Sequence, residues 1–249
     1  HFRLADDVEI TIEAAPGTLP LSKVKLLKQL GVNRLSYGIQ TLDESLLGTM
    51  NRHYSVPEAI QELQGAIEVI GNVNVDTMYG FDGEAEHALF DTLDRFHALG
   101  VPSLSIYSLD KQRNQSKQSF EPPKDNQYDI KIQQFQRAEA ILQERGYAPV
   151  LQNVFAIPGK SSYRHQVRRW DNLTLVSLGV AAQGYAPKTP YQNVASLKSY
   201  YSAIDEGRPP IASMDRLSPE MELCRELTSK LRFTQVHTGE TLQKYGVDI

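Results

Sequence analysis

The sequence predicts an α/β protein in which residues 1–190 form a partial parallel (β/α) barrel and residues 191–249 form a small, mainly helical region. Strand-like segments alternate with single amphipathic helices, and each helix is close to the shortest segment that can connect two parallel strands. A chain of 249 residues also suits one barrel-sized domain with a small addition. These observations favour a sheet built from right-handed crossovers.

The first half of the chain shows this alternation most clearly. Gly31 and Gly100 stand where the left-handed C-terminal cap of a helix belongs. Ser55 with Glu58 forms a capping box, which marks the start of another helix. The expected strands cover residues 8–13, 34–40, 73–80 and 104–109, and the helices between them cover residues 21–30, 55–70 and 89–100.

The second half carries fewer secondary-structure signals, and two proline pairs are its main indications of loops. The helix after the first proline pair has one apolar face at helical spacing. We expect, in order, a loop around Pro122-Pro123, a helix over residues 128–145, a fifth strand over residues 148–155, a short sixth strand over residues 174–180, a boundary at Pro209-Pro210 and a helix over residues 220–231.

Charge and cysteine content exclude several classes of protein. Lys+Arg 26 against Asp+Glu 30 give a net charge of −4, which offers no general electrostatic reason to bind nucleic acid or an anionic membrane. We find no apolar run of the roughly 18–20 residues that cross a bilayer, and expect neither a signal peptide nor a membrane anchor. The single cysteine, Cys224, fits a reducing cytoplasm and excludes a metal site of several thiolates within this chain.

Polar residues end or nearly end three of the expected strands. Glu13, Gln40 and Asp76 occupy these positions, with Asp110 a less clear fourth, and Arg52 follows Gln40 closely enough to reach them. Ligands bind at the carboxyl ends of parallel strands. Two carboxylates, an amide and a guanidinium can hold a small zwitterion that also carries hydroxyls. The alternative interpretation is that these residues are ordinary caps and surface pairs.

The motifs at these strand ends resemble those of one radical S-adenosylmethionine group, the oxygen-independent coproporphyrinogen III oxidases and their haem-chaperone relatives. The resemblance extends from about residue 8 to about residue 240, and its specificity comes from the order and spacing of four motifs. They are Ile12-Glu13-Ala14-Ala15-Pro16-Gly17-Thr18, Asn33-Arg34-Leu35-Ser36-Tyr37-Gly38-Ile39-Gln40, Asn51-Arg52 and Val75-Asp76-Thr77-Met78-Tyr79-Gly80.

The resemblance implies that Glu13, Gln40, Arg52 and Asp76 hold S-adenosylmethionine. It also implies that a 4Fe-4S cluster, served by an electron donor protein, reduces the sulfonium, and that the resulting 5′-deoxyadenosyl radical takes a hydrogen atom from the substrate. The leading expectation is a coproporphyrinogen III oxidase-like enzyme of tetrapyrrole metabolism, with no catalytic residue assigned. The alternatives are a haem-binding chaperone without oxidase activity and a radical S-adenosylmethionine methyltransferase.

The chain departs from the family pattern at its start. The family's Cys-xxx-Cys-xx-Cys motif would lie before residue 1, so no cluster ligand lies in this chain, and the glycine-rich turn after the second strand is absent too. We expect a piece of a longer protein, inactive alone; the alternative is a natural form without a cluster. Four further positions differ from the usual family residue, namely Asp82, Asp110, Ile157 and Gln166.

The run Tyr163–Trp170 is the only dense basic and aromatic stretch. Arg164, Arg168 and Arg169 could pair with propionates while the tryptophan stacks on a pyrrole. The alternative is a solvated surface loop. His165 could be an axial haem ligand, although a lone histidine in such a segment is more often neither ligand nor catalyst.

Overall fold

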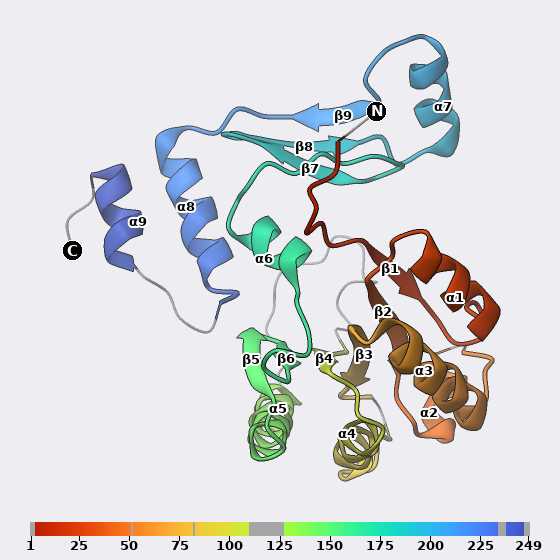
Figure 1. The fold of residues 1–249 in the computed structure, drawn as a ribbon. Helices are drawn as coiled ribbons and strands as arrows, with labels where there is room; N and C mark the ends of the chain where they lie inside the picture. The colour runs from red at the N-terminus through yellow and green to blue at the C-terminus, as the bar shows by residue number, and fades with distance from the viewer. Residues whose placement is uncertain (1–2, 51, 82, 110–126, 234–237, 247–249) are drawn as a thin grey trace. The chain divides into compact units, whose positions relative to one another are not determined.

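The computed structural model describes residues 3–50, 52–81, 83–109, 127–233 and 238–246 (Figure 1). The chain folds as two compact units, His1–Ser162 and Tyr163–Ile249. The expected loop around Pro122-Pro123 lies outside the described residues, as do Asp82 and Asp110. In the part of the chain that the structure describes, no helix has the length and apolar character needed to span a bilayer.

The first unit is built on a six-stranded sheet in the order β1-β2-β3-β4-β6-β5. The first four strands are parallel neighbours, which confirms the expected α/β class and the four strands expected in the first half of the chain. The strands are β1 (Thr11–Ala14), β2 (Arg34–Gln40), β3 (Val73–Tyr79), β4 (Ser103–Ser108), β5 (Ala148–Leu151) and β6 (Val154–Ala156).

The fifth expected strand is in fact a hairpin. Gln152 and Asn153 form a two-residue turn between β5 and β6, and such a short connection can only join antiparallel strands. The backbone carbonyl of Asn153 accepts from the amide of Ile106, which fixes the turn against β4. The sequence pattern therefore identified the extended residues but missed the reversal between them.

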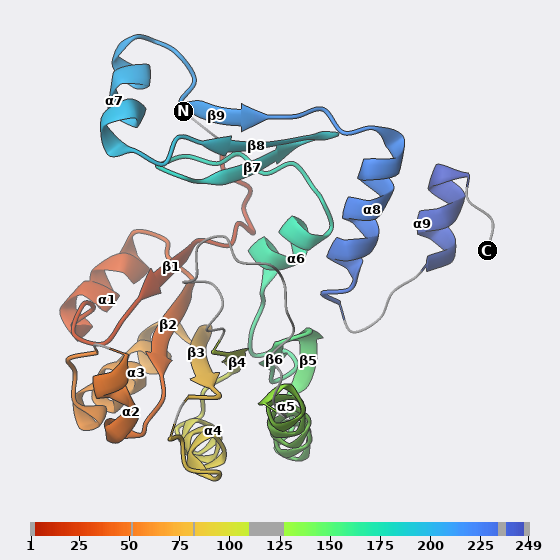
Figure 2. The same cartoon turned by 180° about the vertical axis from the view of Figure 1, so that it is seen from behind.

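Five helices connect the strands and lie along one side of the sheet, as the two opposite views in Figures 1 and 2 agree. Their apolar faces pack against the apolar face of the sheet, where Tyr37, Phe96 and Leu63 are fully buried. The Ser55 hydroxyl accepts from the amide of Glu58, as the capping box predicts. The helices are α1 (Leu21–Gln29), α2 (Glu44–Thr49), α3 (Val56–Ile70), α4 (Ala88–Ala98) and α5 (Gln127–Glu144).

The second unit contains a three-stranded antiparallel sheet, β7 (Gln183–Ala186), β8 (Thr189–Asn193) and β9 (Ile211–Met214). The unit begins at Tyr163, earlier than the boundary expected at residue 190, because β7 pairs with β8, and β8 with β9, in a sheet separate from the parallel one. Its helices are α6 (Arg164–Trp170), α7 (Leu197–Asp205), α8 (Pro219–Lys230) and α9 (Thr238–Tyr245).

The strand expected over residues 174–180 does not form. A single bridge joins Leu175 to Tyr185, and the backbone then turns at Gly179 and Ala181, whose φ angles are +101° and +58°. Positive φ interrupts extended backbone. The apolar residues that suggested the strand therefore lie in an irregular segment, where Leu178 is 77% exposed.

Candidate functional site

The parallel sheet of the first unit has one apolar face and one polar face. Successive side chains of a strand point to opposite faces, and register neighbours on adjacent strands point to the same face. The register places Glu13 beside Ser36, Ser36 beside Asn74, and Asn74 beside Ser103. The next row contains Gly38, Asp76 and Ser105. Glu13 and Asp76, two of the four expected site residues, therefore share the polar face.

Asn74 is the centre of a hydrogen-bond network on this face. Its amide nitrogen donates to Ser36 Oγ at 3.1 Å and to Asp76 Oδ1 at 2.8 Å. Its amide oxygen accepts from Ser103 Oγ at 2.9 Å and from Ser105 Oγ at 3.1 Å. These four bonds use both donors and both acceptors of the side chain, which is fully buried. A satisfied buried network of this kind holds its members in one arrangement.

The network holds the Asp76 carboxylate in place. Ser36 Oγ donates to Asp76 Oδ2 at 3.2 Å, opposite the bond from Asn74. Burial raises the pKa of Asp76 above its ordinary value; hydrogen bonds from Ser36, Ser105 and Asn74 oppose that shift, and the negative charge of Glu13 adds to it. The two carboxylates are thus close enough to interact, with Glu13 exposed and Asp76 half-buried.

Gln40 ends β2 in a strained turn. Its φ angle is +71°, and the amide of Thr41 donates to the carbonyl of Ile39 at 2.9 Å across it, which is the hydrogen bond of a γ-turn. A Cβ atom added to Gly38 would lie 3.1 Å from Gln40 Nε2. Because Gly38 is the register neighbour of Asp76, the Gln40 amide lies over the same polar face. Strain of this kind gathers at functional sites.

Arg52 lies beyond the short helix α2, in a segment that returns to the end of β2. Its backbone amide donates to Leu47, and its side chain is half-buried. The hydroxyl of Tyr54, two residues later, donates to the carbonyl of Ile39. Burial raises the pKa of Tyr54 to about 12, against the opposing effect of the Arg52 guanidinium. The structure therefore places Arg52 near the end of β2 but records no contact between Arg52 and the other three residues.

The opposite end of the polar face is closed by residues 161 and 162. Arg34 Nε donates to the carbonyl of Ser162 at 3.0 Å, and Ser161 Oγ donates to Asn72 Oδ1 at 2.7 Å. Ser162 Oγ reaches Glu9 Oε2 at 3.0 Å. These contacts lie at the amino ends of β1, β2 and β3. The carboxyl ends, where the expected site residues lie, carry none of these contacts from residues 161 and 162.

The turn after β3 is fixed by Glu84. Its Oε2 atom accepts from the amides of Gly80 and Phe81 at 2.6 and 3.1 Å. Burial raises the pKa of Glu84, and those two bonds oppose the shift. Gly80 has a φ of +80°, and a Cβ there would lie 2.7 Å from Lys131 Cε, so both the turn and the neighbouring lysine favour glycine.

Sequence reasoning missed the network around Asn74. Its members look like ordinary strand residues, and serine carries no chemical signature of a site. The signal that could have identified them is the regular alternation within the strands. Alternate positions of β2, β3 and β4 are polar or glycine until Met78 and Tyr107 near the ends of β3 and β4, although parallel strands usually read as continuous apolar runs. The residues concerned are Ser36, Gly38, Asn74, Asp76, Ser103 and Ser105.

Comparison with known proteins identifies relatives of the chain. Residues 1–96 match the model of the radical SAM superfamily. The haem chaperone HemW of Bacillus subtilis is 27% identical over 97% of this chain and 65% of its own length, and HemW of Escherichia coli is 31% identical over 73% and 48%. The solved structure of coproporphyrinogen III oxidase (HemN) from Escherichia coli superposes with a TM-score of 0.78 at 23% identity, over 97% of this chain and 59% of that one.

The chain is related to the HemN/HemW group of radical SAM proteins. It spans between about half and two thirds of the length of the relatives named above. The fold is that of HemN, with the parallel sheet as its core. The expected resemblance to this group is thereby confirmed.

The residues of the chain fit the two cofactors of this superfamily differently. Two carboxylates and an amide on one face, with a guanidinium near the same strand end, are the donors and acceptors that an amino acid portion and a ribose require. A 4Fe-4S cluster needs several thiolates, and this chain holds only the exposed Cys224. The chain therefore suits S-adenosylmethionine and lacks ligands for the cluster.

The basic and aromatic run lies in the second unit, where it forms the helix α6 rather than a loop. The guanidinium carbons of Arg169 and Arg232 lie 5.2 and 4.9 Å from the Trp170 ring centroid. Trp170 is thus already in contact with two cations from its own unit. The haem-ligand and propionate roles considered for this run remain proposals.

Proposed function

We propose that this chain is the S-adenosylmethionine-binding part of a HemN/HemW-like protein of haem metabolism, and that this protein binds haem in the manner of a chaperone. The observation that carries the first part is the polar face that Glu13, Gln40 and Asp76 share. Glu13 and Gln40 lie at the carboxyl ends of β1 and β2, and Asp76 lies midway along β3. The second part is supported by the relatives that align with most of this chain, because they are named haem chaperones.

Each proposed residue has a role that follows from its chemistry. The carboxylates of Glu13 and Asp76 accept hydrogen bonds from an ammonium or from ribose hydroxyls, and the Arg52 guanidinium holds a carboxylate through two parallel N–H bonds. Gln40 supplies one donor and one acceptor in a fixed direction, because the γ-turn sets its backbone. Bound S-adenosylmethionine would supply the sulfonium whose reduction starts the chemistry of the superfamily.

The network around Asn74 gives the proposed site its preorganisation. Ser36 and Asn74 position the oxygens of Asp76 before a ligand arrives, so the side chain loses little conformational entropy on binding. Its raised pKa also makes binding of a cation sensitive to pH. Affinity for an ammonium should fall as the pH drops through the range in which Asp76 takes up a proton, and this range lies above that of an ordinary aspartate.

Calorimetric titration of this chain with S-adenosylmethionine tests the site. Asp76→Asn should weaken binding by about 1–3 kcal/mol, because a charged acceptor is lost while the shape is retained. Glu86→Gln is the matched control, since Glu86 is an exposed carboxylate paired with Arg137 on the surface. Equal affinity of the Asp76 variant and the parent chain would refute the proposed site.

The oxidase is the second candidate function, favoured by the structural likeness to HemN, which shows the fold alone. Two measurements on the complete protein separate the candidates. Stoichiometric haem binding without turnover of coproporphyrinogen supports the chaperone, and decarboxylation of its propionates supports the oxidase. The oxidase would also require an electron donor protein and a cluster held outside these residues. No described feature favours the methyltransferase.

We propose that the protein acts in the cytoplasm. The single cysteine suits a reducing compartment, and the described residues include no helix that could span a bilayer. Fractionation of cells that produce the complete protein tests the placement. Recovery with the membranes after a high-salt wash would contradict it.

A further inference from the structure

The antiparallel sheet of the second unit carries a row of polar side chains across all three strands. Gln183 of β7 is the register neighbour of Gln192 of β8, and Gln192 is the register neighbour of Ser213 of β9. These three side chains therefore point to one face of the sheet. Tyr185 lies two residues after Gln183 and points to the same face. None of these four positions takes part in the site proposed for the first unit.

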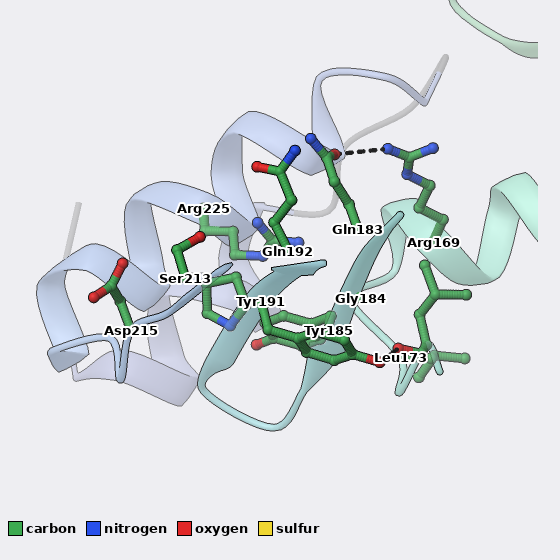
Figure 3. A pocket seen from close by; sticks show the side chains of 12 residues that line it. Arg169, Leu173, Gln183, Gly184, Tyr185, Tyr191, Gln192, Ser213, Asp215 and Arg225 are labelled. Atoms are coloured by element: carbon green, nitrogen blue, oxygen red, sulfur yellow. Dashed lines mark hydrogen bonds between the residues drawn. The ribbon is translucent and has the colours of Figure 1, made fainter. Parts of the chain in front are cut away.

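This face forms the floor of a cavity of about 280 Å³ (Figure 3). Helix α6 contributes Arg169, whose Nη2 lies 3.5 Å from Gln183 Oε1, and helix α8 contributes Arg225. Leu173, Leu175 and Pro190 supply an apolar part of the lining. The cavity thus combines an apolar wall with amides and two guanidinium groups. Its volume is at the lower end for ligand pockets, so it suits a small molecule or one arm of a larger one.

The two guanidinium groups have no carboxylate partner in the described part of the chain. Arg169 contacts Gln183 and the Trp170 ring, and Arg225 lies with its guanidinium carbon 4.5 Å from the Tyr185 ring centroid. The Nε atom of Arg225 is buried and finds no hydrogen-bond acceptor among the described residues. Buried donors are normally paired, and an unpaired one on a charged group is costly.

The charges that line the cavity specify the charge of the missing partner. Arg169 and Arg225 contribute two positive charges, and Asp215 at the end of β9 contributes one negative charge. The remaining single positive charge matches a carboxylate. A phosphate monoester, at about −1.5 to −2, would leave excess negative charge beside Asp215.

We propose that this cavity binds a carboxylate carried on an apolar body, with the carboxylate between Arg225 and Arg169 and the body against the leucine and proline side chains. The carboxylate supplies the acceptor that Arg225 Nε lacks. The amides of Gln183 and Gln192 offer donors and acceptors to further polar groups of the ligand. Two sources have this chemistry, namely a free small organic acid and a propionate arm of a tetrapyrrole; the second source rests on the proposed haem function.

Titration of the complete chain with 4-hydroxybenzoate, an apolar ring with one carboxylate, tests the cavity. Arg225→Gln and Arg169→Gln should each weaken binding about tenfold or more, because each removes a charged hydrogen-bond donor. Arg208→Gln is the matched control, since Arg208 belongs to the same unit but is paired with Glu206. The neutral analogue 4-hydroxybenzamide should bind at least tenfold more weakly, and inorganic phosphate should not displace the acid.

Haem and its dimethyl ester distinguish the two sources. A propionate arm is the ligand if Arg225→Gln weakens binding of haem but not of the ester. A free acid is the ligand if only 4-hydroxybenzoate responds, and this holds even if haem fails to bind and the haem function is refuted. The inference is overturned if neither probe responds to Arg225→Gln and Arg169→Gln, or if the amide or phosphate binds as well as the acid.

Discussion

The two sheets of this protein differ in how the polar side chains on their faces are hydrogen-bonded. In the first unit, Asn74 is fully buried and makes four hydrogen bonds to neighbouring side chains. In the second unit, the polar row beginning at Gln183 borders a cavity, and Arg225 has a buried N–H without a described partner. Both faces are polar, but the side chains around Asn74 satisfy one another, whereas Arg225 at the second face has a buried N–H without an acceptor among the described residues.

The difference shows what a polar sheet face can do. A satisfied network fixes the position of one reactive group, here Asp76, before any ligand arrives. An unsatisfied face gains its missing hydrogen bonds from water or from a ligand. Substitutions should therefore affect mainly stability in the first unit and mainly binding in the second. Substitutions in each unit separate these two cases.

Asn74→Leu should have the largest effect on stability. The substitution removes four hydrogen bonds, three of them buried, and deprives Ser36, Ser103 and Ser105 of the bond that each makes to Asn74, so we expect a loss of about 3–5 kcal/mol in the free energy of unfolding. Urea denaturation of the chain measures it. Gln192→Leu is the matched change in the second unit and should stay within about 0.5 kcal/mol of the parent. Similar losses for both variants would remove the contrast between the sheets.

Gly184→Ala should have the next largest effect. Gly184 lies opposite Tyr191, and a Cβ there would be 2.0 Å from Tyr191 Cζ. The ring would have to leave its place, where its hydroxyl accepts from the amide of Ser177. We expect a loss of about 1–3 kcal/mol in thermal or urea unfolding. Gly239→Ala, in α9 with nothing within 4 Å of its Cβ, is the control and should not be destabilised.

Much of the first unit could be predicted from the sequence because its signals are local. Capping residues such as Ser55 and the alternation of strands with amphipathic helices depend on neighbours a few residues apart. The hairpin at Gln152-Asn153 was missed because its turn lacks glycine, the usual marker of such a turn. The strand expected over residues 174–180 does not form because the backbone turns at Gly179 and Ala181, and a positive φ at alanine could not be predicted from the sequence.

Only part of the candidate site could be predicted from the sequence. Glu13 and Asp76 could be predicted as neighbours because the strands and their parallel order are predictable. The role of Asn74 could not be predicted, since it depends on the register of three strands whose paired residues are 38 and 29 positions apart in the sequence. The cavity of the second unit likewise joins α6, α8 and three strands, and no local pattern brings Arg169 and Arg225 together.

Tyr54→Phe should have a moderate effect, concentrated at the end of β2. Its hydroxyl donates to the carbonyl of Ile39, next to the strained residue Gln40. Loss of this buried hydrogen bond should reduce the free energy of unfolding by about 1 kcal/mol. It should also weaken S-adenosylmethionine binding, because the γ-turn loses a support. Tyr147→Phe removes a similar buried bond, to Val101, and should reduce stability without changing that affinity. Equal effects of both variants on affinity would show that the Ile39 bond does not position the site.

Asp76→Asn should have the smallest net effect on stability, and its sign should depend on pH. Burial raises the folded-state pKa of Asp76 above its unfolded value, so between the two values the folded chain binds more protons than the unfolded chain. Ionisation of Asp76 therefore lowers stability as the pH rises through that range. Asparagine carries no such charge, so the variant should lose this pH dependence and be no less stable than the parent at pH 7, within about 1 kcal/mol.

Urea denaturation at several pH values from 4 to 8, with Asp91→Asn as an exposed control, measures this prediction. Parallel pH profiles for the Asp76 variant and the parent would show that burial of this carboxylate costs nothing. A stable variant with weakened binding would instead show that the first unit retains an ionised Asp76 for its ligand at the expense of stability. The satisfied face would then resemble the unsatisfied one in this respect: each contains one charge whose burial is fully compensated only when a ligand is bound.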